Sequence, residues 1–337
     1  MNKVSQKKIL IFTLKVIVSL SLLTFLLVNI DWEIVVVNVK NANILLLIIA
    51  SVLNIVERFE MTYKWNILIK VRDIIVSFGR LFWINSIGSF LGLFLPSSLG
   101  TDVVRGYYLV KNNFERSVSI SSVFVDRVLG LFSLLLLGVF AVFFAGDLIA
   151  KYNIKFYILL LFVLALIVFY LFQKGEAVNF LEKVLKNIKH KKLIENGIKL
   201  HTSILEYKKY PKTLLLSFLI TLLVQVTRVL TYYFIALSFN IQISVVYFFL
   251  FVPIIMLVIM IPISVGGLGL REGTFVAFFT LVGMSMNDAV IISFINSFLD
   301  TLNTLILGGG GYLFYKAPLK EQIILENKNE IANANGS

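Results

Sequence analysis

The chain has 337 residues, of which 58% are hydrophobic and only 15% are charged. Soluble domains are about 45–50% apolar and about 25% charged, so this composition excludes both a water-soluble enzyme and a disordered chain. The charges are strongly biased, with 31 Lys and Arg against 19 Asp and Glu, and give a net charge of +12.

Residue types that are absent or rare exclude several kinds of site. The chain has no cysteine, which excludes disulfides, thiolate nucleophiles and Cys-type zinc sites. Its two histidines, His190 and His201, lie in one lysine-rich stretch, away from the apolar segments. We therefore expect no cofactor, no metal and no enzyme activity of the chain itself.

Long apolar segments predict six transmembrane helices, because a helix needs about 20 apolar residues to cross the membrane. The first follows Lys3, Lys7 and Lys8, and we expect it to be retained, since no small-residue cleavage site follows it. In the last, Gly308–Gly311 are predicted to pack closely against a neighbouring helix. The six segments are residues 9–29, 44–63, 120–144, 156–172, 213–237 and 288–315. The expected fold is one all-α membrane domain over residues 1–320, followed by a disordered polar tail over 321–337.

Two further apolar segments, residues 79–110 and 245–282, are broken near their middles by proline, serine and glycine. The arms of the first are about 15 residues long, too short to cross the membrane, which predicts a re-entrant helical hairpin. The second has longer arms and is either a re-entrant hairpin or two complete spans. Either arrangement returns the chain to the side from which it entered.

The two breaks resemble each other. The first reads P-S-S-L-G-T-D-V-V-R over Pro96–Arg105, and the second reads P-I-S-V-G-G-L-G-L-R over Pro262–Arg271. Proline, serine, glycine and arginine recur at the same spacing, and the same offset superimposes the flanking predicted helices. This predicts an inverted repeat of helix, hairpin and helix, about residues 44–144 and 210–315, as in many secondary transporters. The alternative is that these clusters only end helices.

The breaks are predicted to line a cavity, because unwound backbone in the hydrocarbon is tolerated only against protein or water. Gly266, Gly267 and Gly269 let the backbone approach a ligand closely. A helix that starts after Gly269 would direct free N–H groups at an anion.

Two arginines follow the breaks at matching positions, Arg105 and Arg271. Their guanidinium groups suit a phosphate, which predicts that the cavity binds a phosphate or a lipid headgroup. The alternative is that each arginine pairs with an acidic neighbour, Asp102 or Glu272, and only stabilises the fold.

Other ionisable residues lie inside apolar segments, where a charge costs about 2.5–3.5 kcal/mol on insertion scales. Glu57, Arg58 and Glu60 lie near the cytoplasmic end of the second predicted helix, from which they can extend to the interface. Arg228 and Asp300 lie deeper, in helices that flank the second hairpin. They are candidates for lining the cavity or for proton coupling, or they form a structural ion pair.

The distribution of Lys and Arg predicts the orientation, because cytoplasmic loops carry an excess of these residues. With a cytoplasmic N-terminus, 22 of them, Lys64 included, fall on the cytoplasmic side and three fall outside. We expect a multi-pass protein of the cell membrane with both termini in the cytoplasm.

Residues 174–212 contain ten lysines and four glutamates, with apolar residues at helical spacing. This pattern predicts amphipathic helices on the anionic cytoplasmic leaflet. A nucleic-acid partner is not expected, because the stretch lacks an aromatic stacking platform.

Three segments together resemble a known family: LFLPSSLGTDVVRGYYLV, VDRVLGLFSLLLLG and IPISVGGLGLREGTFVAFF. They are similar to the flippase-like membrane domain of lysylphosphatidylglycerol synthases, over about residues 8–316. The resemblance implies a protein that moves or presents an amphiphilic lipid, with an aminoacylated phospholipid headgroup or a polyprenyl-linked sugar. The positions that match the family motifs are Pro96, Gly100, Asp102, Arg105, Asp126, Arg127, Gly266, Gly267, Gly269, Arg271 and Glu272.

The chain departs from the full synthases, which carry a soluble catalytic domain after the membrane part, so we expect it not to transfer an aminoacyl group alone. Asp300 also stands where relatives are expected to have a basic residue. The favoured function is a lipid flippase. The alternatives are a membrane-embedded transferase with Asp102, Asp126 or Glu272 as its base, or a membrane subunit for a separate soluble synthase or glycosyltransferase.

Overall fold

All regular secondary structure in the described residues of the computed structural model is helical, as the sequence predicts. These residues are 3–94, 100–111, 114–143, 154–173, 191–261 and 263–313. The helices are α1 (Lys3–Val28), α2 (Trp32–Lys40), α3 (Ile44–Lys70), α4 (Phe78–Leu93), α5 (Gly100–Lys111), α6 (Arg116–Val142), α8 (Ile154–Gln173), α10 (Lys191–Leu205), the 3₁₀ turn η1 (Glu206–Lys209), α11 (Pro211–Ser238), α12 (Val245–Ile259), α13 (Leu270–Thr280) and α14 (Met286–Asn303). The helix α14 continues as a π-helix, η2 (Thr304–Gly309).

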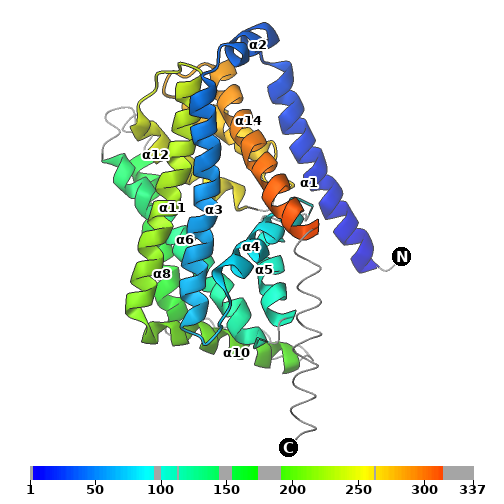
Figure 1. Ribbon diagram of the computed structural model, residues 1–337, viewed down its shortest axis with the longest axis vertical. Helices are drawn as coiled ribbons and strands as arrows, with labels where there is room; N and C mark the ends of the chain where they lie inside the picture. The colour runs from blue at the N-terminus through cyan, green and yellow to red at the C-terminus, as the bar shows by residue number, and fades with distance from the viewer. Residues whose placement is uncertain are drawn as a thin grey trace, which may run out of the picture.

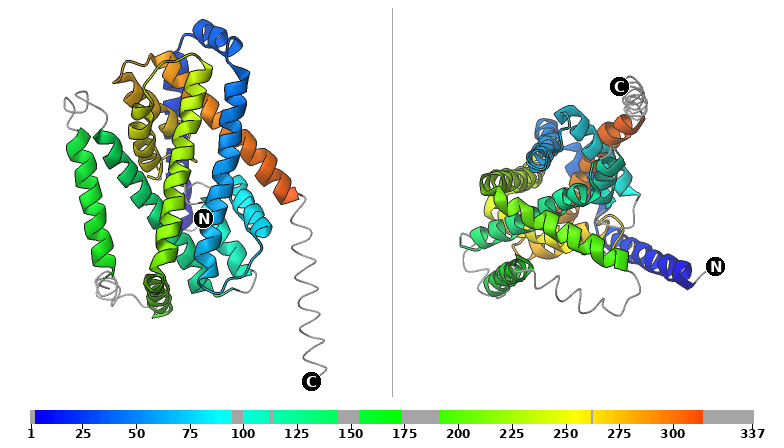
Figure 2. Two further views of the ribbon diagram at one scale, coloured as in Figure 1. Left: turned by 60° about the vertical axis from the view of Figure 1, so that its left-hand side comes forward. Right: turned by 90° about the horizontal axis from the view of Figure 1, so that it is seen from below.

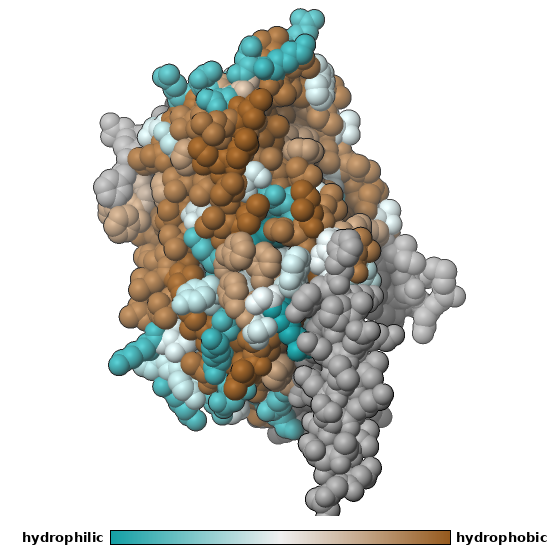
Figure 3. All heavy atoms as spheres, viewed as in Figure 1, coloured by the Kyte–Doolittle hydropathy of each residue, from teal (hydrophilic) through white to brown (hydrophobic). Residues whose placement is uncertain are grey.

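A helix lies over each of the six predicted spans (Figure 1). Within the described residues, three helical segments are long and apolar enough to cross a membrane: Arg116–Ala141, Pro211–Ser238 and Met286–Leu313. The helices α1 and α2 form a further apolar pair, bent by 83°. The surface carries a broad hydrophobic region between two more hydrophilic ends (Figure 3). The chain is an all-α membrane protein.

Both predicted hairpins are present, with α4 packed on α5 and α12 packed on α13. Their helices contain 16, 12, 15 and 11 residues. At 1.5 Å per residue the longest measures about 24 Å, whereas the hydrocarbon core is about 30 Å thick. None of the four helices is therefore long enough to form a complete span, which favours the re-entrant arrangement for the second hairpin as well as for the first. Pro96 and Pro262, in the two breaks, lie outside the described residues.

The two repeats have opposite orientations. Their first helices, α3 and α11, pack along each other and run antiparallel (Figure 1). The hairpin α4–α5 lies near the C-terminal end of α3, and α12 lies toward the opposite end of the molecule (Figure 2). This is the arrangement expected of an inverted repeat.

The helix α10 crosses the ends of the long helices (Figure 1). Arg72, which follows α3, donates to the Ser203 carbonyl at 2.6 Å and pairs with Glu206. The Tyr207 hydroxyl donates to the Leu68 carbonyl at 3.2 Å. These contacts fasten α10 and η1 to α3. Of the predicted amphipathic stretch, residues 174–190 lie outside the described residues, as does the tail 321–337.

The predicted close packing of Gly308–Gly311 is confirmed at Gly308 and Gly311. A Cβ atom at Gly308 would lie 2.6 Å from the Phe90 Cβ of α4, and one at Gly311 would lie 2.5 Å from the Trp83 ring. The absence of side chains at these positions therefore lets the end of α14 pack directly on α4.

We expect Gly308→Ala to lower the stability of the protein by about 1–3 kcal/mol, because the added methyl group must displace α4. Gly310→Ala is the matched control, since a Cβ there meets no atom within 4 Å. Unfolding in detergent, followed by circular dichroism against SDS concentration, measures both. Equal stabilities of the two variants would contradict the packing argument.

Candidate functional site

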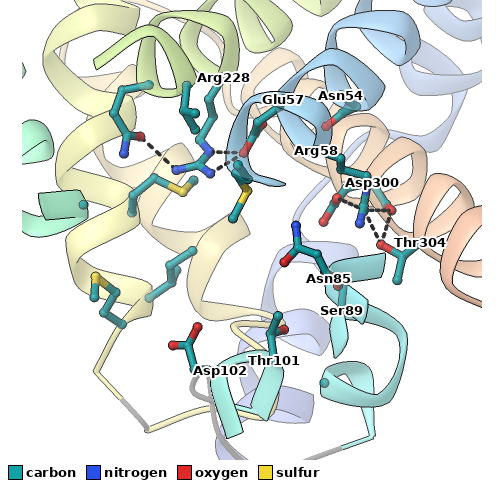
Figure 4. Close-up of a pocket in the computed structure, with 18 of the residues that line it drawn as sticks. Asn54, Glu57, Arg58, Asn85, Ser89, Thr101, Asp102, Arg228, Asp300 and Thr304 are labelled. Atoms are coloured by element: carbon teal, nitrogen blue, oxygen red, sulfur yellow. Dashed lines mark hydrogen bonds and ion pairs between the residues drawn. The ribbon is translucent and has the colours of Figure 1, made fainter. Parts of the chain in front are cut away.

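A cavity of about 370 Å³ lies between the two hairpins. Its lining comes from α3, α4, α5 and α6 of the first repeat and from α11, α12, α13 and α14 of the second (Figure 4). Eight of the predicted site residues line it: Asp102, Arg105, Asp126, Arg127, Arg228, Gly266, Arg271 and Asp300. Segments far apart in the chain thus form one site.

On the side of the first repeat, charges of opposite sign alternate along one chain of ion pairs. Lys64 and Arg105 lie on either side of Asp126, each at 3.0 Å from one of its oxygens. The Arg105 Nη1 also lies 3.4 Å from Asp102. Arg127 Nε in turn donates to Asp102 at 2.8 Å. Lys64, which was counted with the cytoplasmic loops, does not lie in an exposed loop, because its side chain is buried beside Asp126.

Arg105 is only 2% exposed, and its guanidinium group lies 4.2 Å from the centre of the Trp65 ring. Its Nη1 makes both ion pairs, which confirms the expected pairing with Asp102 for that nitrogen. Its Nε and Nη2 have no hydrogen-bond acceptor within the described part of the chain. These two atoms form one edge of the guanidinium group, and such an edge binds a phosphate or carboxylate through two parallel hydrogen bonds.

On the side of the second repeat, ion pairs join α3 to the other half of the molecule (Figure 4). Arg58 lies 2.9 Å from Asp300, and Arg271 approaches the same carboxylate at 3.9 Å. Arg228 Nε donates to Glu57 at 3.1 Å. The interpretation that Glu57 and Arg58 extend to the membrane interface is therefore wrong, because both side chains line the cavity and find partners there.

Glu272 occupies the helix end at which an anion was predicted to bind. It is 1% exposed, accepts from the Gly269 N–H at 2.7 Å and from the Ser297 hydroxyl at 2.5 Å. The N-terminus of α13 is therefore capped by the chain's own carboxylate. Gly269 has φ 75°, and a Cβ there would lie 2.7 Å from the Ser19 carbonyl oxygen of α1. This glycine permits helix packing rather than contact with a ligand.

The remaining predicted residues lie elsewhere. Gly100, Gly267, Gly269 and Glu272 do not line the cavity, and Pro96 lies outside the described residues. The Arg271 Nε lies 3.5 Å from a Glu272 oxygen, so this arginine does approach its acidic neighbour, as the alternative expected.

The charged side chains that line the cavity carry a positive excess. Six are cationic and four are carboxylates. The cations are Arg58, Lys64, Arg105, Arg127, Arg228 and Arg271, and the carboxylates are Glu57, Asp102, Asp126 and Asp300. Glu272 lies behind Arg271 and reduces this excess without lining the cavity. The charges that line the cavity therefore sum to +2, and to +1 when Glu272 is included.

The uncharged polar residues of the cavity are not among the site residues predicted from the sequence. They include Asn54, Asn85, Ser89, Thr101, Gln225 and Thr304. Their signal in the sequence is weak, because Ser, Thr and Asn in membrane helices also hydrogen-bond the preceding turn. Asn85 and Ser89 carry the clearest signal, because polar residues four apart on α4 lie on the same face of the helix.

A family model described as "Lysylphosphatidylglycerol synthase TM region" matches residues 12–308. The chain belongs to this family.

Two UPF0104 membrane proteins of Methanocaldococcus jannaschii are similar to this member of the lysylphosphatidylglycerol synthase TM-region family. MJ1595 is 28% identical over 155 residues, which are 44% of this chain and 46% of that protein. MJ1078 is 25% identical over 246 residues, which are 72% of this chain and 99% of that protein. The match to MJ1595 thus spans about half of its length. No solved structure matches the chain.

Proposed function

We propose that this protein moves a lipid, or a lipid-linked amphiphile, with an anionic headgroup between the two leaflets of the membrane. The observation that carries the proposal is the cationic cavity that both re-entrant hairpins enclose. Membership of the lysylphosphatidylglycerol synthase TM-region family supports it.

The proposed mechanism follows from the cost of moving a charge into hydrocarbon, of order 20 kcal/mol for an isolated ion in the idealised limit. The cavity replaces the water around a headgroup with guanidinium, amide and hydroxyl groups, while the acyl chains stay in the lipid. Because the repeats are inverted, small movements of one against the other would open the cavity to either side in turn. Arg105 lines the cavity, and its buried Nε and Nη2 have no acceptor among the described residues, so we propose that they hold the phosphate once movement of the repeats exposes them.

The contacts of the acidic residues make the transferase alternative weaker. Asp126 lies between Lys64 and Arg105, and Asp102 pairs with Arg105 and Arg127. Glu272 caps α13. Cations or an N–H group of the chain already engage each of the three carboxylates, which makes a role as the base for a substrate less favourable.

The direct test is leaflet exchange in proteoliposomes that contain the purified protein and a fluorescent phospholipid. Dithionite bleaches the outer-leaflet label, and the bleached fraction rises above one half when lipids exchange. We expect faster exchange for anionic lipids than for phosphatidylcholine. Exchange no faster than in protein-free vesicles, across anionic phospholipids and polyprenyl phosphates, would contradict the proposal.

We further propose that both termini lie in the cytoplasm of the cell and that α10 rests on the anionic inner leaflet. Exposed lysines at the end of the molecule that carries α10, among them Lys70 and Lys209, support this orientation.

Because the chain has no cysteine, single cysteines can report its orientation without further substitution. We expect Lys40→Cys, on α2, to react with a membrane-impermeant maleimide in intact cells. Lys209→Cys, at the opposite end, should react only after the cells are permeabilised. Both lysines are exposed, so they are matched for access. The reverse labelling pattern would overturn the proposed orientation.

A further inference from the structure

One carboxyl group at the contact of the two repeats has no cation beside it. Glu60 of α3 accepts a hydrogen bond from the Thr227 hydroxyl of α11 at 3.1 Å through its Oε1. Its Oε2 is buried and has no hydrogen-bond partner among the described residues. Within the same residues, no lysine or arginine forms an ion pair with it. The Glu60 carboxyl therefore lies between the first helices of the two repeats and does not extend to the membrane interface.

Glu60 differs in this respect from the carboxylates of the cavity. Each of the four that line it pairs with a cation, as Glu57 does with Arg228. Removing a carboxylate from water without such a partner is costly, and the neutral acid avoids most of that cost. Glu60 can therefore gain or lose a proton without breaking an ion pair.

Two charges act on Glu60 in opposite directions. The Glu57 carboxylate lies three residues earlier on the same face of α3 and disfavours a second negative charge. The Arg228 guanidinium, which follows Thr227 on α11, favours it. Arg228 pairs with Glu57 and lines the cavity (Figure 4), so the balance between the two charges depends on what the cavity holds.

The other helices that pack on α3 bring groups that are neutral or already paired. From α6 and α14, the carboxylates of Asp126 and Asp300 pair with cations of α3 itself. From α4, the amide of Asn85 donates to a threonine of α3. Glu57 and Arg228 are thus the groups through which an anion in the cavity acts on Glu60.

The charge of the site depends on whether Glu60 carries a proton. The charges that line the cavity, with Glu272, sum to +1, and an ionised Glu60 would bring this sum to zero. An anion in the cavity also competes with Glu57 for Arg228, and the Glu57 carboxylate then repels a negative charge on Glu60 more strongly. An anion in the cavity and a proton on Glu60 therefore favour each other, and such a coupling is reciprocal.

We infer that Glu60 takes up a proton when an anionic headgroup enters the cavity, and that the protein moves the lipid and the proton in the same direction. The inference rests on the proposed function and adds the ion whose gradient drives it. A headgroup with a single negative charge and one proton together carry no net charge across the membrane. Because Glu60 joins α3 to α11, its protonation also changes a contact between the two repeats that are proposed to move.

The test applies a proton gradient to proteoliposomes that contain short-chain fluorescent phosphatidylglycerol, which carries a single negative charge. The lumen is one pH unit more acidic than the outside, and valinomycin with equal potassium holds the membrane potential at zero. Protons then move outward, and we expect the lipid to follow. The ratio of label in the outer and inner leaflets should rise from about one to about ten at the limit, because one pH unit is a tenfold ratio of proton activity. Extraction of the label by albumin on ice measures this ratio, and nigericin, which collapses the gradient, should abolish the rise.

The variant Glu60→Gln keeps an oxygen that accepts from Thr227 but has no proton to release. We expect it to exchange the labelled lipid at the wild-type rate when the pH is equal on both sides, because it resembles the protonated form. Under the gradient its leaflet ratio should stay at about one, because the coupling to protons is lost. The matched control is Glu33→Gln, an exposed glutamate of α2, which should keep the wild-type ratio.

The outcomes separate the inference from the proposed function. A wild-type leaflet ratio equal to that of protein-free vesicles under the gradient, with exchange at equal pH intact, would overturn proton coupling alone. Exchange at equal pH no faster than in protein-free vesicles would contradict both. A full rise in Glu60→Gln would exclude Glu60 as the proton site and overturn the inference.

A further measurement on the wild-type chain decides the site even if Glu60→Gln fails to fold. Dicyclohexylcarbodiimide adds to protonated carboxyl groups in apolar surroundings, whereas carboxylates that pair with cations react poorly. We expect peptide mass spectrometry to find Glu60 modified, and more so in the presence of unlabelled phosphatidylglycerol. Modification of Glu57 or Asp126 in its place would overturn the assignment.

Discussion

Replacing Arg105 with alanine should reduce the exchange of an anionic lipid by roughly 100-fold, because the variant loses two charge-assisted hydrogen bonds to the phosphate. The protein should still fold. Asp126 is almost fully buried beside Arg105, but it keeps the ammonium group of Lys64 at 3.0 Å. The exchange rate in proteoliposomes, normalised to the folded protein recovered after reconstitution, measures the effect.

Arg105→Lys tests whether charge or geometry matters at this position. Lysine keeps the positive charge but cannot offer two parallel N–H groups or stack on Trp65 as a plane. We expect it to remain close to the alanine variant. The control is Arg116→Ala, an exposed arginine at the start of α6 that does not line the cavity. A wild-type exchange rate in Arg105→Ala would assign this arginine to the fold alone.

Replacing Glu57 with alanine should lower the stability of the protein by about 3 kcal/mol, because Arg228 then keeps its charge in the interior without its carboxylate partner. The two side chains are 12% and 21% exposed, and the pair joins α3 to α11, the first helices of the two repeats. Arg228 also donates to Gln225 at 2.9 Å, an interaction that the substitution leaves in place.

Exchanging the two charges tests the contribution of the ion pair separately from the contributions of the two individual side chains. In the double variant Glu57→Arg, Arg228→Glu, the ion pair can form again, and we expect it to recover at least half of the lost stability. Unfolding in mixed detergent micelles measures all variants, with the exposed Glu33→Ala of α2 as the control. The two single variants of this cycle are Glu57→Arg and Arg228→Glu. If their losses of stability simply add in the double variant, Glu57 and Arg228 do not interact in the folded protein.

The amino-acid sequence by itself determined the class of the protein and the order of its helices. In hydrocarbon every backbone N–H and C=O must be satisfied within the segment, so an apolar run of sufficient length specifies a helix without reference to the rest of the chain. The breaks at residues 96–100 and 262–269 follow from the same local rule. Because Arg105 and Arg271 follow these breaks at matching positions, the sequence also predicts that both arginines line one cavity.

Only the tertiary structure decided which charges meet. Arg58 and Asp300 are 242 residues apart, and their pairing depends on how α3 and α14 cross. The same holds for Lys64, which local rules place in a loop after the second span and which is buried against Asp126 of α6. Glu272 fills the helix end that local rules left open for a ligand. A span is specified by its own backbone, whereas the partner of a buried charge is specified by whichever distant helix packs against it.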